Sequence, residues 1–207
     1  MFLEGDSHRH DAVTIVPPLI LASASLYRRQ LLSRLGLTFE ALATGVSETH
    51  ATGESPADRA LRLALEKAGA VAARRPDAVV IGGDQVAAAG DAVLDKPGNA
   101  ARCCAQLQAL SGRTARFYTG CAVLGGSGTL QRAHVDTTTV VFRALSAAEI
   151  ERYVAAEQPF ECAGAFKAEG LGISLFECIE SQDPTALIGL PLIWLAQALR
   201  AAGYRLP

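Results

Sequence analysis

LILASASLYRRQLL, residues 19–32, is the stretch from which the fold and the site are inferred. Three apolar residues stop at small and hydroxyl residues, two arginines follow, and a leucine-rich helical spacing comes next. This order predicts a buried strand, a tight loop, and a helix that Ser25 caps. Free N–H groups at a helix start, with Arg28 and Arg29 in the first turn, favour an anion such as phosphate. Because arginine opposes the helix dipole there, the pair indicates function rather than helix stability.

Composition limits the class of protein. The chain has 207 residues and a formal net charge of −2, enough for one α/β domain. No apolar run approaches the roughly 18 residues of a membrane helix, and no basic run is interleaved with aromatic residues as in duplex nucleic-acid binders. Residues 1–16 lack the apolar core of a secretory signal. We expect them to be a disordered extension before a single domain over residues 17–207.

Cysteine and histidine spacing argues against disulfide and zinc chemistry. The five cysteines are odd in number and include no CxxC pair, so we expect small buried residues in a reducing cytoplasm. The four histidines are scattered. They show no metal-ligand spacing and no local signature of a Ser–His–Asp triad.

Caps and turn residues divide the rest of the chain into alternating strands and helices. We expect strands at 39–43, 79–81, 117–124, 137–142 and 173–179, with a hairpin over 86–94 that turns at Gly90 and Asp91 and a loop at 125–128. We expect helices ending at Gly36, over 57–74 after Ser55, from Asn99 to Ser111, from Ser146 to 156, and over 191–202. This alternation predicts a mixed α/β sheet with helices on both sides.

Asp84 is the sharpest single candidate. It follows the apolar residues 79–81 and two glycines, Gly82 and Gly83, which we interpret as room for a ligand. A carboxylate at the carboxyl end of a strand is a usual place for catalysis or Mg²⁺ binding. An aspartate that stabilises a turn after the strand fits the same spacing equally well.

Two lysines and a glycine-rich segment are weaker signals when each is taken alone. Lys67 shares a helix face with three apolar residues; a snorkelling side chain is the commoner interpretation there, and one that reaches into a cleft is the alternative. Lys96 stands on a rigid turn beside Pro97, although an ordinary exposed lysine is commoner. Segment 163–172 lacks the GxxxxGK[ST] spacing of a Walker loop. Its glycines are typical of a flexible connection, and with Glu169 inside, the segment could close over a ligand.

Taken together and in order, these segments resemble the Maf-type nucleoside triphosphate pyrophosphatases. The matching pieces are LASASLYRRQLL, Glu48, RLALEKA (62–68), IGGDQV (81–86), DKP (95–97), LSGRTARFYTG (110–120) and AGAFKAEGLGISLFECIESQDPTALIGLPL (163–192). The resemblance covers about residues 18–203. It implies an elongated, two-lobed Maf/ITPase-like α/β fold, with a mixed central sheet flanked by helices and a cleft between the lobes.

The resemblance implies hydrolysis between the α- and β-phosphates, which releases a monophosphate and pyrophosphate. Asp84 would be the general base for the attacking water, and Glu48 a second carboxylate that binds metal or orients the water. The side chains assigned to the phosphate oxygens are Ser23, Arg28, Lys67 and Lys96. A Mg²⁺ or Mn²⁺ ion, bound by Glu48 and Asp84, would bridge the phosphates.

Within the family, the chain is most similar to the branch that prefers 7-methyl-GTP. Three specificity positions fall on Tyr27, Gln85 and Glu169, where this branch has an aromatic residue, Gln and Glu. The dTTP/UTP branch has Arg, Thr and Gln there. Methylation at N7 makes guanine cationic, so the ring of Tyr27 attracts it, although tryptophan is usual at this position. The Glu169 carboxylate can accept hydrogen bonds from N1–H and the exocyclic amine.

Two other functions stay open on the sequence. One is a pyrophosphatase for dTTP, UTP or modified pyrimidine nucleotides. The other is a non-catalytic nucleotide- or nucleic-acid-binding regulator of cell division, although a mere binder needs no general base. We expect a cytoplasmic enzyme that binds a nucleoside triphosphate, binds neither membrane nor nucleic acid, and belongs to a family that often forms homodimers.

Overall fold

The computed structural model describes residues 16–90, 92–125 and 130–207, and one mixed sheet organises them. The strand order is β2-β1-β3-β5-β6-β7, with β4 paired to the end of β3. The strands are β1 (Leu19–Ala22), β2 (Glu40–Ala41), β3 (Val79–Ala89), β4 (Ala92–Val93), β5 (Thr114–Gly125), β6 (Gln131–Phe142) and β7 (Phe176–Glu180). β1 is parallel to β2 and β3, whereas every other pair is antiparallel. The predicted mixed sheet is confirmed.

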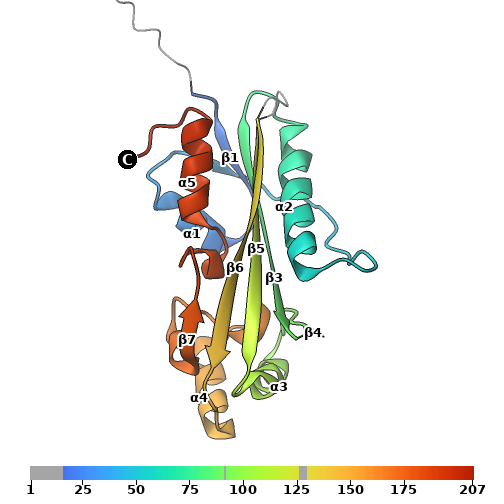
Figure 1. Ribbon diagram of the computed structural model, residues 1–207, viewed down its shortest axis with the longest axis vertical. Coiled ribbons are helices and arrows are strands. Elements are labelled where there is room, and N and C mark those ends of the chain that lie inside the picture. Colours follow the sequence, from blue (N-terminus) through green and yellow to red (C-terminus); the bar gives the residue numbers. More distant parts are fainter. Residues whose placement is uncertain (1–15, 91, 126–129) are drawn as a thin grey trace, which may run out of the picture.

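Five α-helices and three short 3₁₀ turns pack around this sheet in the described part of the chain. The helices are α1 (Leu26–Ser33), α2 (Pro56–Ala72), α3 (Ala100–Leu110), α4 (Ala147–Glu157) and α5 (Leu192–Ala201), and the turns are Ala163–Ala165, Leu171–Leu175 and Ala186–Ile188. Figure 1 shows α2 on one side of the sheet, α1 and α5 on the other, and α3 and α4 at the opposite end. The molecule is therefore elongated, and its two lobes share the long strands β3, β5 and β6.

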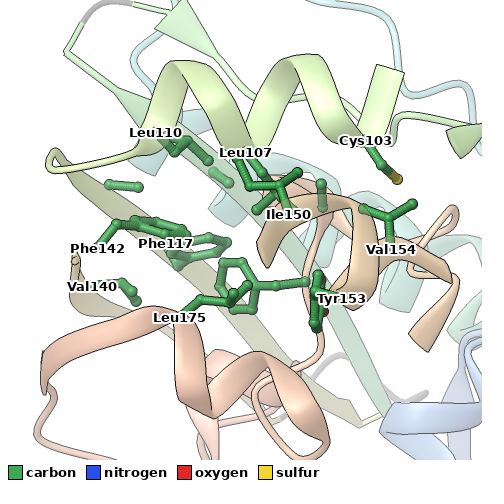
Figure 2. Close-up of a cluster of buried hydrophobic side chains, with 14 of the residues drawn as sticks. Cys103, Leu107, Leu110, Phe117, Val140, Phe142, Ile150, Tyr153, Val154 and Leu175 are labelled. Carbon is green, nitrogen blue, oxygen red and sulfur yellow. The ribbon is translucent and has the colours of Figure 1, made fainter. Parts of the chain in front are cut away.

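Side-chain alternation along β1 explains why helices cover both faces of its lobe. Leu19 and Leu21 pack in a core with residues of α1 and α5, whereas Ile20 and Ala22 pack against α2. Because all four residues are buried, the strand appears in the sequence as an unbroken apolar run. A third core fills the other lobe, where α3, α4, β5 and β6 meet (Figure 2).

The predicted end of the third strand at residue 81 is wrong. β3 continues to Ala89, and its pairing with β5 includes Asp84 opposite Gly120. The parallel neighbour β1 does stop, at Ala22 opposite Gly82. Asp84 thus lies two positions beyond the end of the parallel part but still inside a strand, because β5 continues to pair with the opposite edge of β3.

The glycines before Asp84 make room for the protein itself and not for a ligand. A Cβ on Gly82 would lie 2.0 Å from the Ala64 carbonyl oxygen of α2, and one on Gly83 would lie 3.3 Å from the Arg28 side chain. Gly120 on β5 is similar, since a Cβ there would lie 2.2 Å from the Ala60 carbonyl oxygen. The interpretation of Gly82 and Gly83 as ligand space is therefore wrong, and α2 approaches the sheet unusually closely.

The predicted helix starts are confirmed, whereas several ends differ. Each cap accepts a hydrogen bond from the backbone three residues on; the caps are Ser25, Ser55, Asn99 and Ser146. α1 ends at Ser33, before Gly36, and the strand expected at 173–179 begins only at Phe176, because residues Leu171–Leu175 form a 3₁₀ turn.

Some expectations fall beyond the described residues. The hairpin is confirmed by the pairing of Ala89 with Ala92, while Asp91 lies outside the described residues. Most of the extension expected over residues 1–16, and residues 126–128 of the expected loop, also lie outside them. None of the described helices has the length and apolar character needed to cross a bilayer.

Candidate active site

A buried ammonium group between two carboxylates forms the centre of the site. Lys67 Nζ donates to Asp84 Oδ1 at 2.7 Å and to Glu48 Oε1 at 2.5 Å. Lys67 and Asp84 are each 7% exposed, whereas the Glu48 side chain is 57% exposed. The interpretation of Lys67 as a snorkelling surface lysine is wrong, because its charged end is directed into the protein toward Asp84.

Helix α2 places Lys67 there through small residues on one face. The face contains Ala60, Leu63, Ala64, Lys67, Ala68 and Val71, all of them buried. Their spacing of three or four residues puts them on one side of a helix. Since the alanines of this face meet Gly82 and Gly120, the helix lies close enough to the sheet for Lys67 to reach Asp84.

Glu48 lies on the loop that leads into α2, and two arginines of that helix hold the loop. Arg59 Nη2 donates to the Glu48 carbonyl at 3.0 Å, and Arg62 Nη2 donates to the Thr49 carbonyl at 3.2 Å. The hydrogen bond from Lys67 lowers the pKa of the Glu48 carboxyl, although partial burial opposes this. Glu48 is therefore ionised at neutral pH. Sequence reasoning missed Arg59, because nothing in its spacing separates it from a solvated helix arginine.

Arg28 is the member of the arginine pair that faces the site, whereas Arg29 is exposed. Arg28 Nε donates to the Gly189 carbonyl at 3.1 Å, and Nη1 donates to Ser23 Oγ at 3.4 Å. The same Ser23 oxygen accepts from the Ser25 N–H at 3.2 Å. Burial lowers the pKa of the Arg28 guanidinium, and the negative charges of Asp84 and Glu48 act in the opposite direction. Consecutive helix residues point about 100° apart, which explains the different fates of the two arginines.

Two adjoining cavities gather most of the predicted site residues. One, of about 340 Å³, is lined by residues that include Arg28, Glu48, Arg59, Asp84 and Lys96. The other, of about 140 Å³, is lined by residues that include Tyr27, Gln85, Glu169, Phe117 and Phe166. The cavities are neighbours because Arg28, Gln85, Lys96 and Ala163 line both. Ser23 and Lys67 belong to the same site, because Ser23 accepts a hydrogen bond from Arg28 and Lys67 donates one to Asp84.

Three aromatic residues, Tyr27, Phe117 and Phe166, line the smaller cavity. The Tyr27 hydroxyl lies 3.9 Å from Cys162 Sγ, and burial raises the pKa of Tyr27 to about 12, so the phenol is neutral at physiological pH. The amide of Gln85 donates to the Thr119 hydroxyl and to the carbonyls of Ala186 and Leu187, at 3.0 to 3.1 Å. Gln85 thus ties the 3₁₀ turn Ala186–Ile188 to the sheet, a contact that sequence reasoning did not foresee.

The family of this chain follows from comparison with known proteins. The model of the family described as Maf-like protein matches residues 18–202. The "7-methyl-GTP pyrophosphatase" of Xanthomonas oryzae pv. oryzae (strain KACC10331 / KXO85) is 56% identical over 193 residues, which cover 93% of this chain and 100% of that protein. The protein of the same name from Alkalilimnicola ehrlichii is 52% identical over 190 residues, or 92% and 96% of the two chains. A solved HAM1 protein from Coxiella burnetii is 14% identical, with a TM-score of 0.49 over 89% of this chain and 99% of that one.

Proposed function

We propose, since this chain belongs to the Maf family, that it hydrolyses 7-methyl-GTP to 7-methyl-GMP and pyrophosphate. The observation that carries the proposal is the Glu48–Lys67–Asp84 cluster at the wall of a cavity that Arg28, Arg59 and Lys96 also line. That cavity adjoins a second one, which Tyr27 and Glu169 line. Relatives more than half identical over nearly their whole length are named 7-methyl-GTP pyrophosphatase, which supports the same substrate here.

The larger cavity receives the triphosphate. Asp84 takes the proton of the attacking water as the bond between the α- and β-phosphates breaks. Lys67 fixes the direction of that carboxylate through its hydrogen bond of 2.7 Å. Arg28 and Lys96 line the same cavity and stabilise the charge that grows on the phosphate oxygens.

The smaller cavity receives the base. A 7-methylguanine base carries a positive charge, which the face of the neutral Tyr27 ring attracts. Glu169 adds a carboxylate that can accept from the N1–H and the exocyclic amine of the base. Tyr27 and Glu169 would both attract an uncharged base less strongly than a positively charged one. The pocket therefore favours the methylated nucleotide.

Glu48 and Asp84 fit a divalent cation such as Mg²⁺ or Mn²⁺. Each carboxylate directs one oxygen to Lys67, and within the described chain the second oxygen of each has no hydrogen-bond partner. Mg²⁺ usually takes one or two protein carboxylates and completes its shell with phosphate oxygens and water. When bound, the ion would neutralise phosphate charge. Treatment with a chelator should abolish turnover, and added Mg²⁺ or Mn²⁺ should restore it.

We also propose a reducing cytoplasm as the compartment, and a nucleotide rather than a nucleic acid as the partner. The five cysteines are all free thiols, which suits that compartment. A homodimer stays a prediction from the family resemblance, and size-exclusion chromatography with light scattering tests it.

A side-by-side assay of 7-methyl-GTP, UTP and dTTP tests the proposed function. Pyrophosphate and the nucleoside monophosphate are both quantified, and we expect kcat/KM to be highest for 7-methyl-GTP. A higher value for UTP or dTTP would favour the pyrimidine nucleotide alternative. Tight binding without pyrophosphate release would favour the non-catalytic regulator.

A further inference from the structure

Glu169 lies at the tip of a compact turn. The Gly170 N–H donates to the Lys167 carbonyl at 3.2 Å, which closes a four-residue turn with Glu169 in its centre. A Cβ on Gly172 would lie only 2.3 Å from the same carbonyl oxygen. The glycines here allow the turn to pack closely on itself. They do not form the flexible connection that the sequence favours.

Both sides of this turn are tied to one residue, Glu157, at the end of α4. Lys167 Nζ donates to the Glu157 backbone carbonyl at 2.8 Å and lies 3.4 Å from its Oε1. On the other side, the Leu171 N–H donates to Glu157 Oε2 at 2.8 Å. Gly170 presses against the same carboxylate, since a Cβ there would lie 2.7 Å from Oε2. We call these contacts the Glu157 clasp.

The clasp is sheltered enough to fix geometry. The side chains of Lys167 and Glu157 are 23% and 17% exposed, and hydrogen bonds to a charged group are stronger than neutral ones. Tyr153, one turn earlier on α4, adds a further tie because its hydroxyl accepts from the Lys167 N–H at 3.1 Å.

Glu169 depends on this support. Its side chain is exposed and makes no hydrogen bond or ion pair with any other described residue, so only the backbone of the turn fixes the point from which its carboxylate reaches. A recognition group needs neighbours that hold it in place. We propose that Glu157 and Lys167 are positioning residues that hold Glu169 against the base pocket and thereby set base selectivity. The identity of the base rests on the proposed function.

Kinetics of Glu157 variants test the proposal. We expect Glu157→Ala to raise KM for 7-methyl-GTP about tenfold, as loss of a charged hydrogen bond can, while kcat changes less than about threefold. Glu157→Gln should stay within about threefold of wild-type KM, because an amide oxygen still accepts from Leu171. Glu151 is an exposed glutamate on the same helix. Its variant Glu151→Ala is the matched control and should have the KM and kcat of the wild type.

A double variant shows whether Glu157 acts through Glu169. In the Glu169→Ala background, Glu157→Ala should change KM less than about twofold, because the group that it positions is gone. An equal effect in both backgrounds, or a fall in kcat at unchanged KM, would overturn the proposal.

Hydrogen exchange separates the clasp from the proposed function. Without nucleotide, the amides of residues 168–172 should exchange faster in Glu157→Ala than in the wild type, and unchanged exchange would overturn the clasp. If the wild type does not cleave 7-methyl-GTP, the proposed function fails. The KM comparisons are then made with whichever of UTP and dTTP the enzyme cleaves. An unchanged KM for Glu157→Ala with that substrate overturns the positioning role of the clasp.

Discussion

Gly82→Ala tests whether close packing of α2 on the sheet builds the site. The new Cβ would lie 2.0 Å from the Ala64 carbonyl oxygen, whereas a carbon and an oxygen need about 3.3 Å. Helix α2 must therefore move by roughly 1.3 Å. The backbone of residue 82 fixes the position of the Cβ, and the Ala64 oxygen is itself a backbone atom, so no change of rotamer relieves the clash. Overpacking of a core costs about 1–3 kcal/mol, and we expect a loss near the upper end in the free energy of unfolding, measured with urea.

The same displacement acts on catalysis. Lys67 follows Ala64 by three residues on α2, and its Nζ lies 2.7 Å from Asp84 Oδ1. A shift of roughly 1.3 Å stretches this contact to about 4 Å, the limit of an ion pair. Because misplacement by about 1 Å can cost about 100-fold in rate, we expect kcat/KM for 7-methyl-GTP to fall by about that factor.

Gly69→Ala on the same helix is the matched control. A Cβ there meets no atom within 4 Å, and alanine stabilises a helix interior over glycine by about 0.5–1 kcal/mol. This variant should be slightly more stable and fully active. A Gly82→Ala protein with wild-type stability and turnover would refute the packing argument.

Three further predictions concern the general base, a helix cap and the pocket for the nucleotide base. Asp84→Asn should keep the wild-type circular dichroism spectrum and lower kcat by about 100-fold or more; near-wild-type turnover would disprove its role as general base. Hydrogen bonds from the Ser146 backbone and hydroxyl lower the pKa of Glu149 to about 2, below the unfolded value of about 4.3. The stabilisation that Glu149 contributes is thus complete above the unfolded pKa and is lost as pH falls toward the folded pKa of about 2. The difference in unfolding free energy between the wild type and Glu149→Gln should shrink from pH 6 to pH 3, and a constant difference would contradict this. Tyr27→Trp should raise the ratio of kcat/KM for 7-methyl-GTP over GTP by about twofold to fivefold, because indole is the best face for a cation; an unchanged ratio would argue against a stacked base.

Much of the local structure could be predicted from the sequence. The caps at Ser25, Ser55, Asn99 and Ser146 start helices as expected, because a cap bonds to backbone only three residues away. β1 was predictable because both of its faces are buried, which leaves an unbroken apolar run. The family resemblance supplied the nine candidate site residues, although several of these side chains, taken one by one, have an ordinary structural interpretation.

Other features depend on contacts between distant parts of the chain. The sequence predicts that the strand before Asp84 ends at residue 81, because two glycines follow and glycine weakens a strand interior, yet β5 pairs with β3 through and beyond both of them. Lys67 taken alone is interpreted as a surface lysine, because nothing beside it in the sequence indicates a buried carboxylate 17 residues further on. Its burial requires the two glycines that let α2 approach, Gly82 and Gly120, on different strands.

The sequence by itself therefore determined which helices start where, which strand is buried on both faces, and which charged residues are available for chemistry. These are matters of spacing, and they act over a few residues. Only the tertiary structure decided that Lys67 joins Glu48 to Asp84, and that Glu157 holds the turn of Glu169. A charge can be buried only where a partner compensates its lost hydration, and here those partners come from segments far apart in the chain.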